Sequence, residues 1–215
     1  MIITADRSAL TAGGTYQSAT VHVEAQEFEA QAITFENTYG HGSQAVALSL
    51  RTDQAIFHDC RFLAWQDTLY ASSGRMYLQD CFIEGDVDFI FGDAKAIFEA
   101  CEIHSRGPGY ITAQGRTSPD KRSGFVFRHC RLTGNKTGKG LYLGRPWRPY
   151  ARVVYVICQM EKHIRAVKRR LSLLNRIRPK RSSEWLGRKL LRVAKPRNSN
   201  QQRFSETKMA GCPMV

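Results

Sequence analysis

Short apolar runs separated by turn residues fill the chain from about residue 20 to residue 160. Apolar and polar positions alternate within the runs, which is the period of a β-strand. No stretch in this region keeps the spacing of an amphipathic helix. The pattern therefore predicts an all-β protein.

One strand unit recurs, and cysteines mark it. An apolar run leads into a cysteine in segments 56–62, 76–83, 96–103, 125–132 and 153–160. Residues 32–38 resemble an earlier copy, with Thr38 in the cysteine's place. Strand-like repeats at such regular steps are typical of a β-solenoid in which each repeat is one coil. We predict a right-handed parallel β-helix, a single-stranded solenoid; a leucine-rich repeat is the alternative, but its leucine spacing is absent.

Stacked coils place equivalent residues in ladders about 4.8 Å apart. The ladder of Cys60, Cys81, Cys101, Cys130 and Cys158 is expected to face inward as small apolar filler. Disulfides between stacked coils are the alternative. No CxxC pair occurs, so the spacing indicates neither a zinc site nor a thioredoxin-type motif.

Charge divides the chain into two parts. Residues 1–160 hold 16 Lys+Arg and 16 Asp+Glu, whereas residues 161–215 hold 16 Lys+Arg and three Glu, which accounts for the net charge of +13. We therefore expect a β-helix over residues 1–164 and a basic tail over 165–215 that is irregular or partly helical, with a helical turn or two over 167–174. No apolar run reaches the roughly 18 residues that a membrane span needs, and no signal peptide is visible at the N-terminus.

Polar residues one coil apart form the candidate site. Asp67 and Asp88 are separated by the same step as the first two ladder cysteines, and Gln44 and Gln66 by one residue more. The carboxylates and the amides are therefore each expected to stack in pairs. Two adjacent carboxylates repel, which keeps one protonated beside one that is ionised. Such a pair suits a general acid next to an anionic nucleophile, and two amides suit an oxyanion.

Asp88 also needs a cation that holds its charge. In the stretch Gly85-Asp86-Val87-Asp88-Phe89-Ile90-Phe91-Gly92, Asp88 stands directly before the apolar residues. A carboxylate at such a position is unfavourable unless it is paired. Arg145, in Leu143-Gly144-Arg145-Pro146-Trp147, is the candidate, because arginine reaches a carboxylate with two parallel hydrogen bonds. A surface arginine near a turn is the alternative. Tyr70, Phe89 and Phe91 either line a cleft or face the core, and the core is the commoner position for such aromatics.

Five blocks of this sequence resemble, in order and spacing, the signature blocks of pectin methylesterases. They are Gln44–Leu48, Gln66–Tyr70, Gly85–Gly92, Ile111–Arg116 and Leu143–Trp147, within a resemblance that runs from about Thr4 to about Ile164. The family fold is a right-handed parallel β-helix. No GxSxG elbow and no HExxH motif is present, so other esterase mechanisms are not supported.

The resemblance implies hydrolysis of the galacturonate methyl esters of pectin. It implies that Asp88 is the nucleophile, Asp67 the acid and then the base, and Arg145 the residue that orients Asp88. Gln44 and Gln66 would stabilise the oxyanion, and substrate binding would involve Thr15, Gln44, Arg145 and Trp147. No metal or organic cofactor is implied, and an extracellular or cell-wall monomer that acts on pectin is expected.

The chain also departs from the family pattern. The family has further coils before the segment at Thr4, and a Pro-x-Gly-Trp block where this chain has its basic tail. We interpret residues 165–215 as out-of-frame sequence, with a basic arm that binds acidic pectin as the alternative. Nucleic-acid binding is not expected, because the tail interleaves only Trp185 and Phe204 with its charge. The rival to an active enzyme is an inactive truncated β-helix that binds acidic polysaccharide weakly or not at all.

Overall fold

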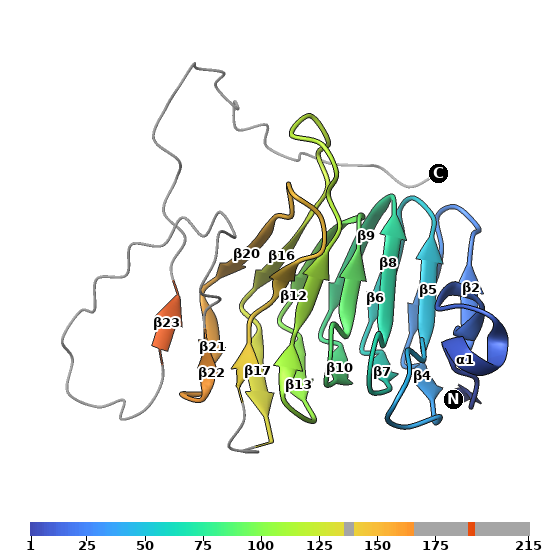
Figure 1. The fold of residues 1–215 in the computed structure, drawn as a ribbon. Helices are drawn as coiled ribbons and strands as arrows, with labels where there is room; N and C mark the ends of the chain where they lie inside the picture. Colours follow the sequence, from blue (N-terminus) through green and yellow to red (C-terminus); the bar gives the residue numbers. More distant parts are fainter. Residues whose placement is uncertain (136–139, 166–188, 192–215) are drawn as a thin grey trace.

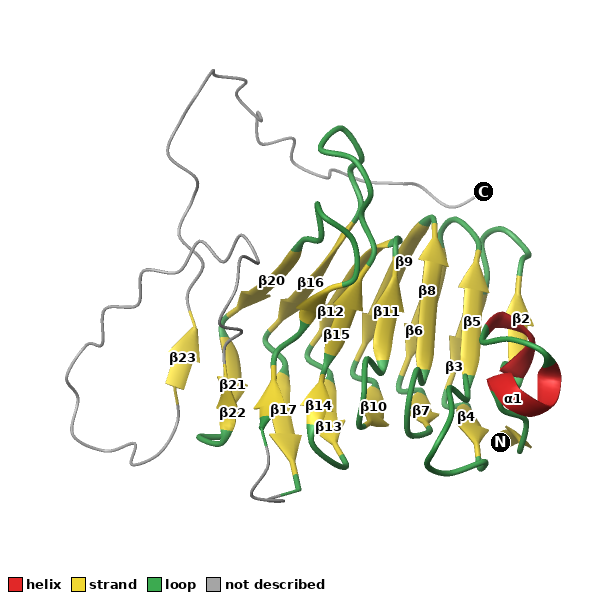
Figure 2. Cartoon of the chain, viewed as in Figure 1, coloured by secondary structure: helices red, strands yellow, loops and turns green. Residues whose placement is uncertain are grey.

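Parallel strands stacked side by side build the protein in a computed structural model, as Figure 1 shows. The structure describes residues 1–135, 140–165 and 189–191. Each coil contributes one strand in turn to three parallel sheets, which we call A, B and C, and the later coils add a strand to a fourth sheet, D. The predicted all-β parallel β-helix is confirmed. The only α-helix in the described residues, α1 (Ala9–Ala12), lies with a 3₁₀ turn (Tyr16–Ser18) at the first coils (Figure 2).

The strands fall into four sheets. Sheet A contains β1 (Ile2–Ala5), β4 (Thr34–Asn37), β7 (Arg61–Leu63), β10 (Phe82–Gly85), β13 (Glu102–Ser105), β17 (Arg131–Gly134), β21 (Cys158–Met160) and β23 (Lys189–Leu191). Sheet B contains β2 (Val21–Val23), β5 (Leu48–Arg51), β8 (Leu69–Ser73), β11 (Ile90–Gly92), β15 (Thr112–Gln114) and β19 (Arg145–Pro146). Sheet C contains β3 (Glu29–Gln31), β6 (Ala55–His58), β9 (Arg75–Gln79), β12 (Lys95–Glu99), β16 (Gly124–Arg128) and β20 (Val153–Val156). Sheet D contains β14 (Gly109–Tyr110), β18 (Leu141–Tyr142) and β22 (Ile164–Arg165).

A left-handed residue marks the corner from sheet C to sheet A in successive coils. Asp59, Asp80, Ala100, His129 and Ile157 have φ between 50° and 55°, and each immediately precedes a ladder cysteine. One residue in this conformation turns the chain sharply, so the next strand can start at once. The cysteine steps in the sequence are therefore the coil lengths.

The first copy of the repeat is shifted from its predicted alignment. Ala32 is the left-handed corner of that coil, with φ of 53°, and Phe35 pairs with Phe62. Ile33 thus occupies the cysteine's place, whereas Thr38 lies beyond the end of β4. The prediction for Thr38 was wrong. It aligned Phe35 with Phe57, which lies before the corner, whereas Phe35 pairs with Phe62, which lies after it.

The ladder cysteines are all buried and free, which confirms the inward ladder and excludes the disulfide alternative for them. Their thiols donate to carbonyl groups, as when Cys101 contacts the Leu78 oxygen of the preceding coil at 3.4 Å. Other ladders fill the rest of the interior. Along sheet C, Phe57, Leu78, Phe98 and Phe127 are in register and fully buried.

The tail is described only at β23, which pairs antiparallel with β21. This part of the predicted irregular or partly helical tail is therefore a strand. The helical turn predicted for 167–174 lies outside the described residues. No helix in the described part of the chain is long and apolar enough to cross a membrane.

The ladder on sheet C predicts a sharp difference between adjacent residues. Phe98 is fully buried and stacks on Phe127 at 4.4 Å, whereas Ile97 points outward and is 37% exposed. Phe98→Ala should lower the free energy of unfolding by about 3 to 5 kcal/mol, because it leaves a cavity in the stack. Urea unfolding measures the change. Ile97→Ala is the matched control and should lower it by less than about 1 kcal/mol; equal losses would contradict the assigned faces of β12.

Candidate active site

The corners that lead into sheet B carry the two predicted carboxylates. Asp67 and Asp88 are left-handed, with φ of 69° and 52°, a conformation that aspartate tolerates better than most residues. The amide of Leu69 donates to the Phe89 carbonyl at 2.8 Å, in a register that places the two aspartates in equivalent positions of adjacent coils. The predicted stacking of Asp67 on Asp88 is confirmed.

The two glutamines also stack as predicted. The Ala45 amide donates to the Gln66 carbonyl at 3.1 Å, which aligns Gln44 with Gln66. The extra residue in this coil is absorbed where the amides of Ala47 and Leu48 share the Thr68 carbonyl. Both glutamine side chains are half-buried, and neither side-chain amide is hydrogen-bonded within the described part of the chain. Both amides are therefore free to donate to a bound molecule.

Arg145 binds Asp88 although the two lie far apart in the sequence. Its Nε donates to both carboxylate oxygens of Asp88 at 2.9 Å, and its terminal nitrogen donates to Oδ2 as well. The Arg145 side chain is half exposed, but Asp88 is only 5% exposed. A forked, charge-assisted contact of this kind fixes both the charge and the orientation of the carboxylate. The predicted Arg145–Asp88 pair is confirmed, and the surface-arginine alternative is wrong.

Asp67 has the opposite environment. It is 8% exposed, and its carboxyl group has no hydrogen-bond partner in the described residues. Burial raises the pKa of its carboxyl to about 8, the charges of Asp88 and, more weakly, Asp86 also raise it, and the Arg145 guanidinium opposes them. Near neutral pH the site therefore holds one ionised carboxylate beside one protonated carboxyl, as general acid–base chemistry requires.

An aromatic surface continues outward from the carboxylates. Tyr70, Phe91, Ala113 and Arg145 are lateral neighbours on successive strands of sheet B. Tyr70 and Phe91 stack with ring centroids 4.4 Å apart, and Trp147 meets Phe91 edge to face at 6.1 Å. Because Trp147 is 44% exposed, it offers a ring at the surface beside Arg145.

The three aromatics considered for a cleft are split between two faces. Phe89 is fully buried in the core, as expected from the commoner position. Tyr70 and Phe91 belong to a second, smaller apolar cluster with Ala19, Val46 and Ala113, in which Phe91 is buried and Tyr70 partly buried. The core expectation is therefore confirmed for Phe91, on the opposite face of the strand from Ile90, and Tyr70 packs against that cluster.

Thr15 lies at the start of the 3₁₀ turn, away from the strand corners that carry the four stacked polar residues. Its carbonyl accepts from the Ser18 hydroxyl at 2.7 Å. Thr15 makes no hydrogen bond to Asp67 or Asp88 in the described structure, and its binding role stays a prediction.

A further group of residues beside the carboxylates was missed by the sequence-based prediction. His41, Trp65, Asp86 and Arg106 contact one another next to Gln66 and Asp67. The available signal was Asp86, which sits in the same short stretch as Asp88 and is buried.

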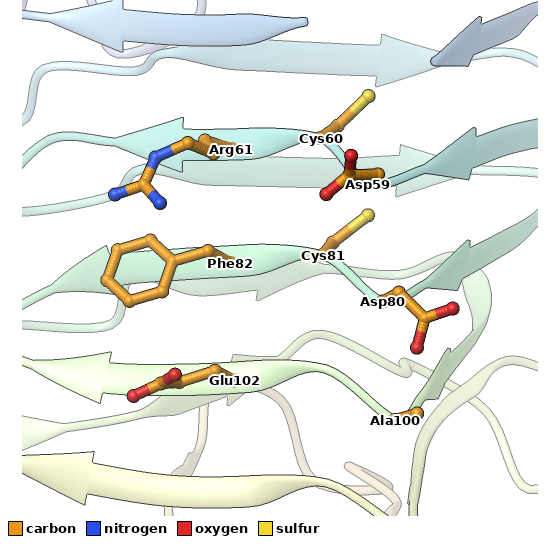
Figure 3. A pocket seen from close by; sticks show the side chains of 8 residues that line it. All are labelled: Asp59, Cys60, Arg61, Asp80, Cys81, Phe82, Ala100 and Glu102. Carbon is orange, nitrogen blue, oxygen red and sulfur yellow. The ribbon is translucent and has the colours of Figure 1, made fainter. Parts of the chain in front are cut away.

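A surface pocket of about 400 Å³ lies at another corner, where sheet C passes into sheet A. Figure 3 shows Asp59, Asp80 and Glu102 along it, with Arg61 over the Phe82 ring. None of the predicted site residues lines this pocket.

Comparisons with known proteins agree with this geometry. The family model described as Pectinesterase matches residues 1–169. The chain is 50% identical over 155 residues to pectinesterase 31 of Arabidopsis thaliana, covering 72% of this chain and 49% of that protein. It therefore spans about half the length of this curated relative.

Solved structures show the same fold. Pectin methylesterase from carrot matches with a TM-score of 0.74 and 37% identity, over 78% of this chain and 58% of the carrot chain. A pectin methylesterase in complex with a hexasaccharide matches with a TM-score of 0.71 and 30% identity, over 77% of this chain and 62% of that one.

Asp67 should make stability depend on pH in a particular direction. Its pKa is raised from 3.8 to about 8, so the folded state keeps the proton while the unfolded state releases it. Its contribution to stability is therefore full below about pH 4 and is lost as the pH rises toward 8. Asp67→Asn cannot lose this proton. At pH 9 its free energy of unfolding should therefore exceed that of wild type by a few kcal/mol, on the order of 1.4 kcal/mol per unit of the pKa shift.

Urea unfolding of both proteins between pH 4 and pH 9 measures this difference. Asp53→Asn is the control, because Asp53 is paired with Arg75 and its pKa is lowered to about 2. The stability of Asp53→Asn relative to wild type should not increase as the pH rises. An Asp67→Asn difference that stays constant with pH would contradict a protonated Asp67.

Proposed function

The chain belongs to the pectinesterase family, and on that premise we propose that it carries a carboxylic ester hydrolase site that demethylates the galacturonate methyl esters of pectin. The observation that carries the proposal is the pair of unlike carboxyl groups. Asp88 is bound by Arg145, and Asp67 beside it has a pKa of about 8. An ionised nucleophile next to a protonated acid is what acyl transfer from an ester needs.

The first half of the proposed reaction forms an acyl-enzyme. A carboxylate oxygen of Asp88 attacks the ester carbonyl carbon, and the carbonyl oxygen becomes an oxyanion. The intermediate collapses by breaking the bond to the methoxy oxygen, which takes the proton of Asp67 and leaves as methanol. The galacturonate acyl group remains on Asp88 as a mixed anhydride, and Asp67 is left ionised.

The second half restores the site. Asp67 takes a proton from water as the water oxygen attacks the acyl carbon of the anhydride. The bond to Asp88 breaks, so Asp88 regains its charge and its contact with Arg145. The product is a free galacturonate carboxyl group, and Asp67 again holds its proton.

Gln44 and Gln66 serve the oxyanion in this proposal. Their side chains are half-buried and stacked, and their amides are without hydrogen bonds to the rest of the described chain. Preorganised donors aimed at a developing charge are worth about 10²- to 10³-fold in rate for one such group. The Arg145 guanidinium already binds Asp88, so it orients the nucleophile.

The aromatic surface suits a polysaccharide substrate. Trp147 offers an exposed flat ring beside Arg145 on which a sugar ring can stack, and the buried Phe91 supports it edge to face. The relative solved with a bound hexasaccharide supports a saccharide ligand. We propose pectin as the partner, with Thr15 as a further contact and a secreted or cell-wall location in keeping with the family. We further propose a monomer, with the β-helix unit over 1–164 and a separate basic tail over 165–215.

Methanol release from methyl-esterified polygalacturonate tests the reaction. The chain should release methanol, and Asp88→Asn should lower kcat at least about a thousandfold, because the variant lacks the nucleophile. The wild-type kcat should fall as the pH rises above about 8, where Asp67 loses the proton that methanol needs. Asp53→Asn, a change of the same type at an exposed salt bridge, is the control and should keep the wild-type rate.

If the folded wild-type chain is as inert as Asp88→Asn, the enzymatic proposal is wrong for this chain. The rival, a β-helix without catalysis that binds acidic polysaccharide weakly or not at all, would then hold. Circular dichroism with a cooperative unfolding transition establishes that the inert protein is folded.

Trp147 should act on binding more than on chemistry. Trp147→Ala removes an exposed ring that contacts Phe91 but no carboxylate. KM for polymeric substrate should rise about 2- to 10-fold with kcat within about twofold, in line with roughly 0.5 to 1.5 kcal/mol for an aromatic contact. Steady-state kinetics measures both values, and a large loss in kcat at unchanged KM would contradict a binding role.

A further inference from the structure

Asp86 is a buried carboxylate that has no part in the proposed reaction. It is 7% exposed and lies just before Val87 and Asp88. Its Oδ1 accepts from the Val87 amide at 2.6 Å, and its own amide donates to the Trp65 carbonyl at 3.0 Å. Asp86, in the coil that carries Asp88, is thereby fixed against the coil that carries Asp67.

His41 holds the other oxygen of Asp86. Its Nδ1 lies 3.1 Å from Oδ2, and the imidazole packs on the Trp65 ring with centroids 3.6 Å apart. The Arg106 guanidinium carbon lies 3.7 Å from the centre of the same ring, and Arg106 binds Glu84 at 3.1 Å. We call these five residues, His41, Trp65, Glu84, Asp86 and Arg106, the brace.

The brace connects directly to the site. Trp65 precedes Gln66 and Asp67, and Asp86 precedes Val87 and Asp88. The Asp67 amide in turn donates to the Val87 carbonyl at 3.1 Å. Contacts that hold Trp65 and Asp86 therefore fix the two corners on which the site is built.

We propose that Asp86 is a further positioning residue of this site: held by His41 and the Val87 amide, its charge keeps the proton on Asp67. This inference rests on the proposed function, because that proton is the one given to departing methanol. Asp86 itself does not touch the reacting atoms.

The charges around Asp67 support this role. Three charged groups act on it: Asp88, Arg145 and Asp86. The single cation among them, Arg145, makes a forked contact with Asp88 and lowers the pKa of Asp67. Asp86 adds a second negative charge, which raises the pKa of Asp67 beyond what burial and Asp88 achieve. Among titratable side chains, the His41 ring is the one that contacts Asp86 within the described residues, and His41 is 63% exposed.

Glu84 supplies a matched control within the same brace. It is a carboxylate on the same strand end as Asp86, and it is paired with Arg106. It does not appear among the charges that act on Asp67. Loss of the Glu84 charge should therefore leave the Asp67 titration unchanged, although it removes a carboxylate from the same brace.

Carbon-13 NMR of aspartate-labelled full-length protein tests the proposal without turnover. The carboxyl signal that disappears in Asp67→Asn identifies Asp67, and its titration midpoint is measured in wild type, Asp86→Asn, Asp86→Ser and Glu84→Gln. Both changes at Asp86 keep a group that accepts from the Val87 amide. They should lower the midpoint by about 0.5 to 1 pH unit, as expected for removal of one nearby like charge. The fall of kcat at high pH should move down by the same amount.

Equal midpoints in wild type and both Asp86 variants would overturn the proposal, as would an equal shift in Glu84→Gln. If one Asp86 variant does not fold, the other decides. A midpoint that moves in a chain that releases no methanol would leave the electrostatic link standing and remove the proposed function instead. If the chain releases methanol but the Asp86 variants move neither the Asp67 midpoint nor the pH profile of kcat, the proposed function stands and the role of Asp86 is wrong.

Discussion

In-register stacking of coils is the constraint on which the rest of this structure depends. A parallel β-helix brings residues together only if equivalent positions of successive coils align. The left-handed corners before each ladder cysteine set that alignment, because one sharply turned residue starts each new strand. The same conformation recurs at Asp67 and Asp88, so the corners that build the solenoid are also the positions of its carboxylates.

Stacking alone would make a poor site. Two buried carboxylates on adjacent coils repel, and neither would be held in a defined protonation state. Arg145 breaks the symmetry because it binds Asp88 with a forked contact and leaves the Asp67 carboxyl without a hydrogen bond among the described residues. Chemically identical side chains thereby become an ionised carboxylate and a protonated acid. Their difference arises from one strand, β19, three coils beyond Asp67 in sheet B.

Much of this could be predicted from the sequence, for reasons that lie in the repeat. The separation of Asp67 and Asp88 becomes a neighbour relation once the coil length is known, and the cysteines reveal that length. Arg145 was chosen because arginine can bind a carboxylate with two parallel hydrogen bonds, and the family resemblance implied the same role. The first copy of the repeat was misaligned because it lacks a cysteine, and a left-handed corner at Ala32 is not visible in residue type. The placement of Tyr70 and Phe91 in a second apolar cluster was missed for a related reason: an unbroken apolar run does not tell which residue begins the alternation.

The brace was missed although part of it follows the repeat. Trp65, Asp86 and Arg106 are separated by the same steps as Cys60, Cys81 and Cys101, so they lie at equivalent positions of successive coils, whereas His41 lies off that ladder. Their contacts depend on where each turn leaves its side chain once the strands are stacked. The electrostatic balance of the site thus has two sources. One ladder supplies the reacting carboxylates, and a neighbouring ladder supplies the fixed charge of Asp86 that makes their protonation states differ further. Because Asp86 and Asp88 share one turn, the contacts that hold Asp86 also hold the corner on which Asp88 stands.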